Sequence, residues 1–339
     1  MLGAGSFPQS TLLPILNQLE AVELIGIASA SGLSARSAAE RYSFAYCTSD
    51  WQALLHDPSI NTVAIVTRHH LHARQVLAAL VAGKHIFVEK PLCLNESELD
   101  AITIAYHAAS QRATSLGAPP PLLMVGFNRR FAPFIQELQQ QLQRVTEPLM
   151  LHYRVNGGFI AAEHWTQDPA QGGGRLLGEG CHFIDLLIWL AGSHVHRVTT
   201  YALAAGAQSG RSVGALQRNV PSDNLLVVLE FANGSLAHLT YVANGDRNLG
   251  KEYLEVSGGG LSARLDDYRR LQIHHGRTHI ERQAWLRQDK GHRATWQALV
   301  RTLTQGEPVP MTFASVHQST AVTLAAQRSL LSGAPVEAI

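Results

Sequence analysis

The first 127 residues alternate short, continuously apolar stretches with segments of helical periodicity. This alternation limits the possible folds more than any other feature of the chain. Apolar stretches without polar alternation are typical of strands that are buried on both faces. Strands are expected at 22–29, 61–67, 85–89 and 122–127, and helices at 35–42, 71–82 and 96–110. Strands and helices in this order build a parallel sheet with helices on both sides, so the sequence predicts a doubly wound α/β domain.

From residue 128 the pattern changes to strands that follow one another, and then to helices. One helix is expected at 131–143 and two more near 292–304 and 315–332. Strands are expected at 149–155, 195–203, 224–231, 235–243, 252–257 and 268–274. The dipeptide Asn233-Gly234 between two of these strands indicates a hairpin. Residues 128–339 are therefore predicted to form an α+β domain with a mainly antiparallel sheet, separate from the domain at 1–127.

Composition excludes several classes of protein. The chain has 339 residues, 46% of them hydrophobic and 16% charged, which is typical of a globular protein. Its net charge of +1 argues against nucleic-acid binding, and no apolar run is long enough to predict a membrane span. No signal peptide is expected. The single cysteines Cys47, Cys93 and Cys181 form no framework for disulfides or zinc, which favours a reducing, cytoplasmic location.

The segment Gly3-Ala4-Gly5-Ser6-Phe7-Pro8 is a partial G-x-G-x-x-G motif. Its first two glycines would allow a tight turn and a close approach of the backbone to a pyrophosphate at a helix N-terminus. Pro8 replaces the third glycine, and the strand that should precede the motif is reduced to Met1-Leu2. The motif predicts a dinucleotide-binding loop that includes Gly3, Gly5, Ser6 and Phe7. An ordinary glycine turn is the alternative.

Two residues are candidates for catalysis. Lys90 follows the strand expected at 85–89, and ligands of open α/β sheets bind at the carboxyl ends of strands. The chain has only three other lysines, Lys84, Lys251 and Lys290. His182 follows a glycine-rich stretch and could exchange a proton near neutral pH. The alternatives are a solvated lysine and a histidine that only begins a helix.

Taken together, these segments resemble the Gfo/Idh/MocA family of nicotinamide-dependent oxidoreductases over nearly the whole chain. The matching segments are Gly3-x-Gly5, Gly83-Lys84-His85, Glu89-Lys90-Pro91, Gly126-Phe127-Asn128-Arg129-Arg130, Trp165-x-x-Asp168-Pro169, Gly172-Gly173-Gly174 and Gly180-x-His182-x-x-Asp185. More narrowly, the chain resembles the half that some bacterial proteins carry fused behind a zinc-type alcohol dehydrogenase.

The resemblance implies a Rossmann domain with a truncated first strand at 1–127, and a substrate and oligomerisation domain at 128–339. It implies NAD or NADP as cofactor and a sugar, polyol or sugar nucleotide as substrate, with Lys90 and His182 at the reacting oxygen. Cofactor contacts are expected from Gly3, Gly5, Ser6, Phe7, Ser29, Ser31, Arg36, Thr67, Arg68, His69, His72, Glu89 and Lys90. Substrate contacts are expected from Arg129, Tyr153, Trp165 and His182.

The sequence departs from the family pattern at two places. The family commonly has an aspartate four residues before the histidine, where this chain has Gly178. Glu179 stands one position later, where a side chain points in another direction. No acidic residue stands at the end of the strand expected at 22–29. Ser29, Ser31 and Arg36 stand there instead and would accommodate the 2′-phosphate of NADP.

Two further interpretations remain open. A non-catalytic sensor of cofactor or sugar, or a regulatory module of a larger fused protein, is the alternative to an oxidoreductase. The clusters His69-His70-x-His72 and His274-His275 with His279 lack accompanying acidic or cysteine ligands, so no metal site is expected. The strands at 224–231 and 235–243 are apolar on both faces, which predicts a homo-oligomer formed through the sheet.

Overall fold

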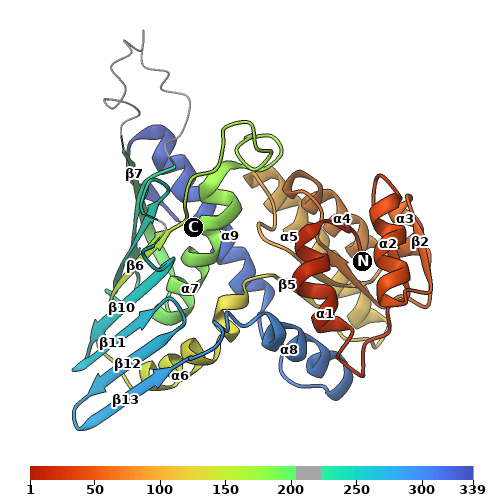
Figure 1. The fold of residues 1–339 in the computed structure, drawn as a ribbon. Coiled ribbons are helices and arrows are strands. Elements are labelled where there is room, and N and C mark those ends of the chain that lie inside the picture. Colours follow the sequence, from red (N-terminus) through yellow and green to blue (C-terminus); the bar gives the residue numbers. More distant parts are fainter. Residues whose placement is uncertain (204–222, 247, 339) are drawn as a thin grey trace. The chain divides into compact units, whose positions relative to one another are not determined.

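The computed structural model describes residues 1–203, 223–246 and 248–338, which form two compact units (Figure 1). Unit 1 consists of Met1–Ala132, Ala170–Gly173 and Gly291–Thr320. Unit 2 consists of Pro133–Pro169, Gly174–Lys290 and Ala321–Ile339. The chain thus passes between the units several times. The single boundary between residues 127 and 128 stays a prediction.

Unit 1 contains the predicted parallel sheet. Its strands are β1 (Gly26–Ala28), β2 (Tyr46–Thr48), β3 (Thr62–Ile65), β4 (His85–Val88) and β5 (Leu123–Val125). Leu2 lies between β1 and β3 and pairs in parallel with Ala28 and Ile65. This short contact takes the place of a first strand, and it joins the pair β1–β2 to the three strands β3, β4 and β5. The buried strand residues, such as Phe87, confirm the doubly wound interpretation.

Helices connect these strands, and further helices complete unit 1. The connecting helices are a π-helical turn (Pro8–Leu12) continued by α1 (Leu13–Leu16), α2 (Leu33–Tyr42), α3 (Trp51–His56), a 3₁₀ turn (His69–Leu71) with α4 (His72–Val81), and α5 (Glu96–Ser115). A 3₁₀ turn (Asn128–Phe131), α8 (His292–Gln305) and the first part of α9 (Phe313–Ser332) come after these strands in the chain. Asn95 caps α5 as predicted, because its Oδ1 accepts a hydrogen bond from the Glu98 amide at 2.9 Å. The sequence did not predict β2 or α3, whose 3 and 6 residues are too short for a periodic pattern.

Unit 2 is built on a large mixed sheet. Among the described residues its strand order is β13-β12-β11-β10-β6-β9-β8-β7-β14, and only β6 and β9 pair in parallel. The strands are β6 (Met150–Asn156), β7 (Val195–Ala202), β8 (Leu225–Phe231), β9 (Leu236–Val242), β10 (Glu252–Gly258), β11 (Leu261–Asp266), β12 (Arg270–His275), β13 (Thr278–Gln283) and β14 (Val336–Glu337). Asn233 and Gly234 form the turn between β8 and β9, which confirms the predicted hairpin.

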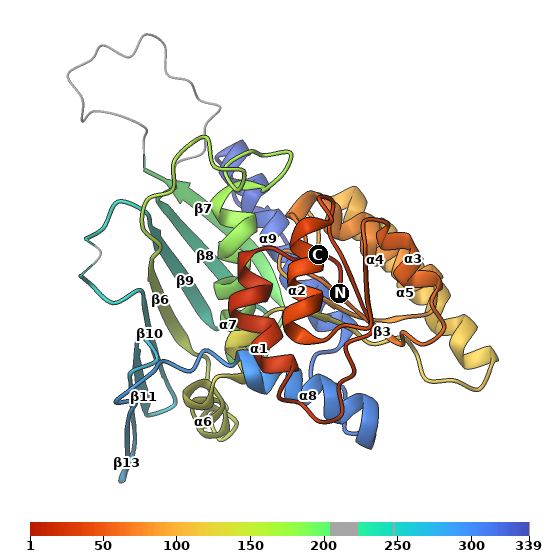
Figure 2. The ribbon, with the colours of Figure 1, turned by 45° about the vertical axis from the view of Figure 1, so that its right-hand side comes forward.

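Helices cover one face of this sheet (Figure 2). They are α6 (Pro133–Leu142), a π-helical turn (Leu176–Gly180) continued by α7 (Cys181–Ala191), and the last part of α9. All residues of α7 except Trp189 are buried. Inward-facing strand residues such as Leu151 and Val227 are buried too, so the core of unit 2 lies between the helices and the sheet. No helix in the described ranges is long and apolar enough to cross a membrane.

Candidate functional site

The glycine loop of unit 1 has the shape that a dinucleotide needs. Gly3 has φ +104°, and a Cβ atom there would lie 2.6 Å from the carbonyl oxygen of Val66. Only glycine therefore allows the loop to pass so close to β3. At Gly5, by contrast, a Cβ would meet no atom within 4 Å, so the space in front of the helix that follows is open. This geometry fits a pyrophosphate at the helix N-terminus.

The residues predicted to contact the ribose, Ser29, Ser31 and Arg36, follow β1 in the chain. The Ser29 hydroxyl accepts hydrogen bonds from the Ala35 amide at 3.1 Å and from the Ser34 hydroxyl at 2.9 Å, and so binds the first turn of α2. The Arg36 guanidinium pairs with Glu40 at 3.0 Å in an exposed position. An exposed pair of this kind contributes little to stability, so Arg36 can exchange Glu40 for another anion.

Lys90 follows β4 at the carboxyl edge of the sheet, as predicted, and Glu89 lies directly before it. The Glu89 carboxylate accepts a hydrogen bond from the Lys90 amide at 3.3 Å. A Cβ on Gly126 would lie 2.8 Å from that carboxylate, so glycine makes room for it. Burial raises the pKa of Glu89 to about 7, although Lys90 and Arg129 act in the opposite direction. Glu89 therefore takes up or releases its proton near neutral pH.

His72 contacts the backbone of Pro91, the residue after Lys90, and that of Thr67. Its side chain is fully buried, with Nδ1 2.7 Å from the Pro91 carbonyl oxygen and Nε2 3.1 Å from that of Thr67. Burial lowers the pKa of His72 to about 4, so the neutral ring donates to only one of the two carbonyl groups at pH 7. His72 thus holds the end of β3 and the turn after Lys90 together. Its predicted contact with the cofactor stays a prediction.

The residues between β3 and α4 bind the segment Ala170–Gly173, which belongs to unit 1 although its neighbours in sequence belong to unit 2. The Arg68 guanidinium donates to the Gln171 side chain at 2.8 Å, and His69 Nδ1 lies 2.7 Å from the Gly172 carbonyl oxygen. Burial, helped by Lys90, lowers the pKa of His69 to about 3. Arg68 and His69 therefore attach this glycine-rich segment at the same edge as Lys90.

In unit 2, His182 is the second residue of α7 and is 6% exposed. The preceding turn is π-helical, because the Cys181 amide donates to the carbonyl of Leu176, five residues earlier. A π-helical turn contains one residue more than the regular helix needs, so it changes the direction of the side chains around it. Such turns are frequent at functional sites.

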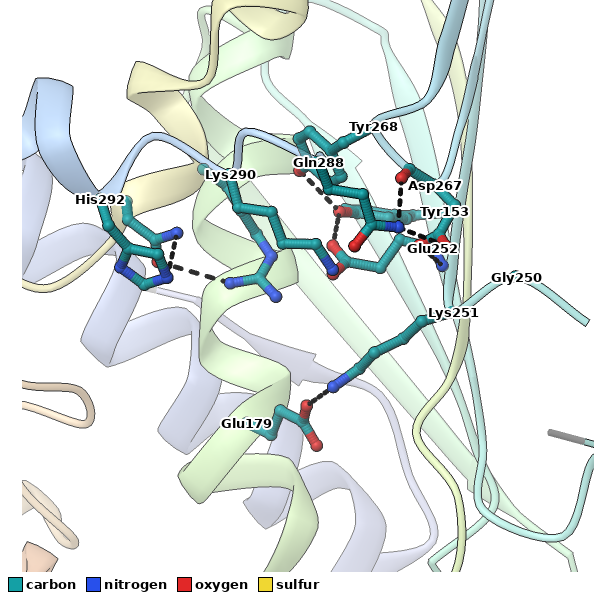
Figure 3. Close-up of polar contacts among 12 residues, drawn as sticks. Tyr153, Glu179, Gly250, Lys251, Glu252, Asp267, Tyr268, Gln288, Lys290 and His292 are labelled. Atoms are coloured by element: carbon teal, nitrogen blue, oxygen red, sulfur yellow. Dashed lines mark hydrogen bonds and ion pairs between the residues drawn. The ribbon is translucent and has the colours of Figure 1, made fainter. Parts of the chain in front are cut away.

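Glu179 lies in that turn and forms the centre of a charged cluster, of which Figure 3 shows the ion pair with Lys251. Its carboxylate accepts from Lys251 Nζ at 2.6 Å, from Arg175 Nη2 at 3.2 Å and from the Tyr241 hydroxyl. Burial alone would raise the pKa of Glu179, but Lys251, Tyr241 and Arg175 outweigh it and lower the pKa to about 2. The carboxylate is therefore ionised throughout the physiological range and is bound within this Glu179 cluster.

Gly157 makes room for the Glu179 cluster. A Cβ at this position would overlap the Tyr241 hydroxyl and lie 2.6 Å from Arg175 Nη2. The sequence motifs do not predict the cluster, since its members come from the π-helical turn and the residue before it, from β9 and from the residue before β10. The available signals were Glu179, beside the place of the expected aspartate, and the scarcity of lysine, since lysines of this chain have specific partners. Lys84, for instance, is buried and donates to the carbonyls of Asp57 and Ile60.

The predicted substrate residues differ in their surroundings. Tyr153 is fully buried, and its hydroxyl donates to Glu252 at 2.6 Å, while Lys290 donates to the same carboxylate at 2.7 Å (Figure 3). This burial favours a structural role for Tyr153, and its contact with a substrate stays a prediction. Arg129 is buried in unit 1, and Trp165 is half-buried in unit 2.

The second histidine group lies on the hairpin of β12 and β13, as predicted. His274 and His279 face each other across the two strands, with 3.1 Å between their Nδ1 atoms. Within the described ranges, no group of three or more histidine, cysteine, aspartate or glutamate residues is arranged to hold a metal ion.

Family profiles match both parts of the chain. One is described as "Oxidoreductase family, NAD-binding Rossmann fold" and matches residues 1–116. The other is described as "Oxidoreductase family, C-terminal alpha/beta domain" and matches residues 143–338. The chain belongs to the Gfo/Idh/MocA oxidoreductase family. The resemblance in the residues is thereby confirmed at the level of the family.

Individual relatives of this Gfo/Idh/MocA protein include dehydrogenases of small polyhydroxylated compounds and others. Levoglucosan dehydrogenase of Pseudarthrobacter phenanthrenivorans is 30% identical over 241 residues, which are 64% of this chain and 58% of the relative. Inositol 2-dehydrogenase of Acidothermus cellulolyticus is 24% identical over 234 residues, 68% of this chain and 62% of the relative. The chain thus matches about three-fifths of the length of these proteins.

Solved structures share the fold. An oxidoreductase domain protein from Kribbella flavida superposes with a TM-score of 0.83 at 20% identity, covering 100% of this chain and 98% of the other. A levoglucosan dehydrogenase in complex with NADH and levoglucosan gives 0.79 at 22% identity, covering 99% and 98%. At these identities the likeness concerns the fold, a Rossmann-type parallel sheet followed by a mainly antiparallel sheet.

Proposed function

We propose that the protein is an NAD(P)-dependent oxidoreductase that moves a hydride to or from a CH–OH carbon of a sugar or polyol. The observation that carries this proposal is the glycine loop, closed against β3 at Gly3 and open in front of the helix at Gly5. The relatives that act on levoglucosan and inositol support the substrate class. When bound, the nicotinamide supplies or accepts the hydride, and the protein aligns the substrate and handles the alcohol proton.

Lys90 and His182 are assigned separate tasks in this proposal. The Lys90 ammonium polarises the reacting oxygen, and the half-buried setting of the residue strengthens that interaction. His182 takes the alcohol proton during oxidation and returns it during reduction. Thr67, Arg68, His69, His72 and Glu89 hold the loop ends around Lys90.

Steady-state kinetics with a panel of sugars and polyols, read at the absorbance of the reduced nicotinamide, tests the proposal. Lys90→Ala and His182→Ala should each lower turnover by ~10²–10⁴. Cofactor affinity should change far less than turnover, because the pyrophosphate contacts are assigned to Gly3 and Gly5. His279→Ala, on an exposed hairpin, serves as the control. Near-normal turnover of His182→Ala would contradict the assignment and favour the sensor interpretation.

We also propose that the protein assembles into a homo-oligomer, most simply a two-fold dimer. On the sheet face opposite the helices of unit 2, β6, β7, β8 and β9 expose Met150, Tyr201, Leu226 and Leu236. The strand register puts these side chains on one face. An apolar surface of this kind usually marks an interface. Light scattering that gives a single 36.9 kDa species at micromolar concentration would contradict the proposal.

Two finer expectations remain part of the proposal. The isolated cysteines favour a cytoplasmic location. The resemblance to the half of a fused bacterial protein predicts a partner domain of the zinc-type alcohol dehydrogenase class, and the genomic sequence upstream of Met1 tests it.

A further inference from the structure

A pocket of about 290 Å³ opens in unit 1, beside Met1. Its walls are the residues that lead into β1, the residues that lead into β3, and one side of α8. Leu16 at the end of α1 also lines it, and α1 and α8 lie side by side (Figures 1 and 2). The pocket therefore lies at the amino ends of the parallel strands, whereas the glycine loop and Lys90 lie at their carboxyl ends.

Met1 and Leu2 extend from this pocket into the gap between β1 and β3. The Leu2 amide donates to the Ala64 carbonyl at 2.7 Å, and the Ala28 amide donates to the Met1 carbonyl at 2.9 Å. The Met1 amino group donates to the Gly26 carbonyl at 2.5 Å. Met1 and Leu2 thus bond to the strands on both sides, as the residues of a central parallel strand do. Beyond Met1, the residues before β1 and β3 line the pocket instead.

Two buried polar atoms in the lining lack a partner. Among the described residues, no hydrogen-bond partner is found for Trp296 Nε1 or Thr62 Oγ1. Trp296 is only 4% exposed. Buried polar atoms nearly always have a partner, so these two atoms point to a group that supplies hydrogen bonds in the pocket.

The Met1 amino group is buried as well. This burial lowers its pKa to about 5, because a charged amine is unfavourable away from water. The nitrogen of a peptide bond at the same place would donate to Gly26 without a charge to bury. The surroundings of this nitrogen therefore suit an amide better than an amine.

The remaining walls of the pocket are mainly apolar. Ile25 lies directly before β1 and is only half-buried, although β1 is an inner strand of the sheet. Phe44, Leu299 and Leu303 line the pocket from other elements. An occupant with apolar side chains would cover these residues, and its backbone would offer donors and acceptors to the strands on either side.

We infer that this pocket is the site of a further strand segment, which is joined to the nitrogen of Met1 and completes the sheet between β1 and β3. Leu2 pairs with Ala28 and Ile65, and in the same register about three residues in front of Met1 would reach Leu24 and Asn61. Their side chains should be continuously apolar, as in the other inner strands. The inference does not depend on the proposed function, because its tests measure stability and hydrogen exchange.

Thermal unfolding of the full chain with the tripeptide Val-Ile-Val in front of Met1 tests the inference. Its Tm should be about 5 °C or more above that of the unextended protein, because the segment buries apolar area and extends the sheet. Ser-Asn-Ser in front of Met1 is the matched control. It has the same length and also converts the amino group to an amide, but it has no apolar side chains to bury. Equal Tm values of the two extended proteins, or no increase with Val-Ile-Val, would overturn the inference.

Hydrogen exchange of the Ala64 amide locates the segment. The Ala64 carbonyl accepts from Leu2, and the Val66 amide donates to Leu2. Because alternate residues of a strand turn their backbone groups to the same side, the Ala64 amide faces the place of the residue before Met1. Val-Ile-Val should slow exchange of this amide by at least about tenfold relative to the unextended protein. An unchanged exchange rate contradicts a segment between β1 and β3.

Substitutions in two helices of unit 1 show whether the pocket receives the segment. Leu303→Asp puts a charge into the α8 wall and should remove most of the gain in Tm that Val-Ile-Val gives. Ile104→Asp puts the same charge on α5, where the side chain is 70% exposed and outside the lining, and should leave the gain intact. The gain is measured between extended and unextended forms of each variant, so a loss of stability from the substitution itself cancels. An equal gain in both variants overturns the assignment to this pocket.

A free peptide distinguishes a segment of the chain from a separate ligand. Acetyl-Val-Ile-Val-amide at millimolar concentration should leave the Tm of the unextended protein unchanged, because a separate peptide loses translational and rotational freedom on binding and the joined segment does not. An increase in Tm as large as that of the joined tripeptide would show a site for a separate ligand and overturn the inference.

Discussion

The Glu179 cluster should contribute strongly to the stability of unit 2, and Glu179→Gln tests this. The side chain of Glu179 is 20% exposed, and its carboxylate accepts from two cations and one hydroxyl. A pKa lowered from 4.5 to about 2 corresponds to about 3 kcal/mol of stability at neutral pH. Glutamine keeps the shape but removes the charge, so Lys251 and Arg175 lose their shared anion. The expected loss is therefore about 3 kcal/mol.

The effect has a defined pH dependence. Because the pKa of Glu179 is lower in the folded than in the unfolded protein, its contribution is fully present above about pH 4.5. It is lost as the pH falls through about 2. The difference in stability between the unchanged protein and Glu179→Gln should thus be constant from pH 7 to about 5 and decrease only below that range.

The measurement has to report on unit 2, since two units need not unfold together. Hydrogen exchange of the amides in α7 and β10 provides this local reading. Glu281→Gln is the matched control, because its pair with Arg270 is exposed at both side chains and should contribute less than about 1 kcal/mol. A loss in Glu179→Gln no larger than that of the control would refute the reasoning. Adding Lys251→Met to Glu179→Gln should recover part of the loss, as both partners are then removed.

Three further predictions concern unit 1. Gly3→Ala should destabilise the protein and abolish cofactor binding, because its Cβ meets the Val66 carbonyl. Gly5→Ala should fold normally and weaken only cofactor binding, and thermal unfolding together with nucleotide titration distinguishes the two variants. Glu89→Gln should leave stability unchanged below pH 4.5 and raise it above about pH 7, because burial makes the ionised carboxylate unfavourable. An equal difference in Tm between the variant and the unchanged protein at pH 4 and pH 8 would contradict this. NADP should bind at least as tightly as NAD, and Arg36→Ala should weaken only NADP; NAD binding tenfold more tightly in titration would show the preference to be wrong.

Much of the fold could be predicted from the sequence because it depends on local pattern. The apolar stretches of β3 and β4 and the Asn233-Gly234 turn are each encoded within a few residues. The positions of Gly3 and Lys90 at the carboxyl ends of parallel strands follow from the same pattern together with the rule for open α/β sheets. The short elements β2 and α3 escaped prediction, since 3 and 6 residues do not establish a period.

The sequence by itself determined the two kinds of sheet, the glycine loop and the place of Lys90, all of which rest on short-range periodicity and on backbone geometry. Only the tertiary structure decided which charges meet. Glu179 lies 62 residues before Tyr241 and 72 residues before Lys251 along the chain. The pairing of β6 with both β9 and β10 brings Tyr241 in β9 close to Lys251, the residue before β10. Likewise, only the structure shows that the buried Tyr153 hydroxyl binds Glu252, because periodicity assigns a side chain to a face of the sheet and does not name its partner.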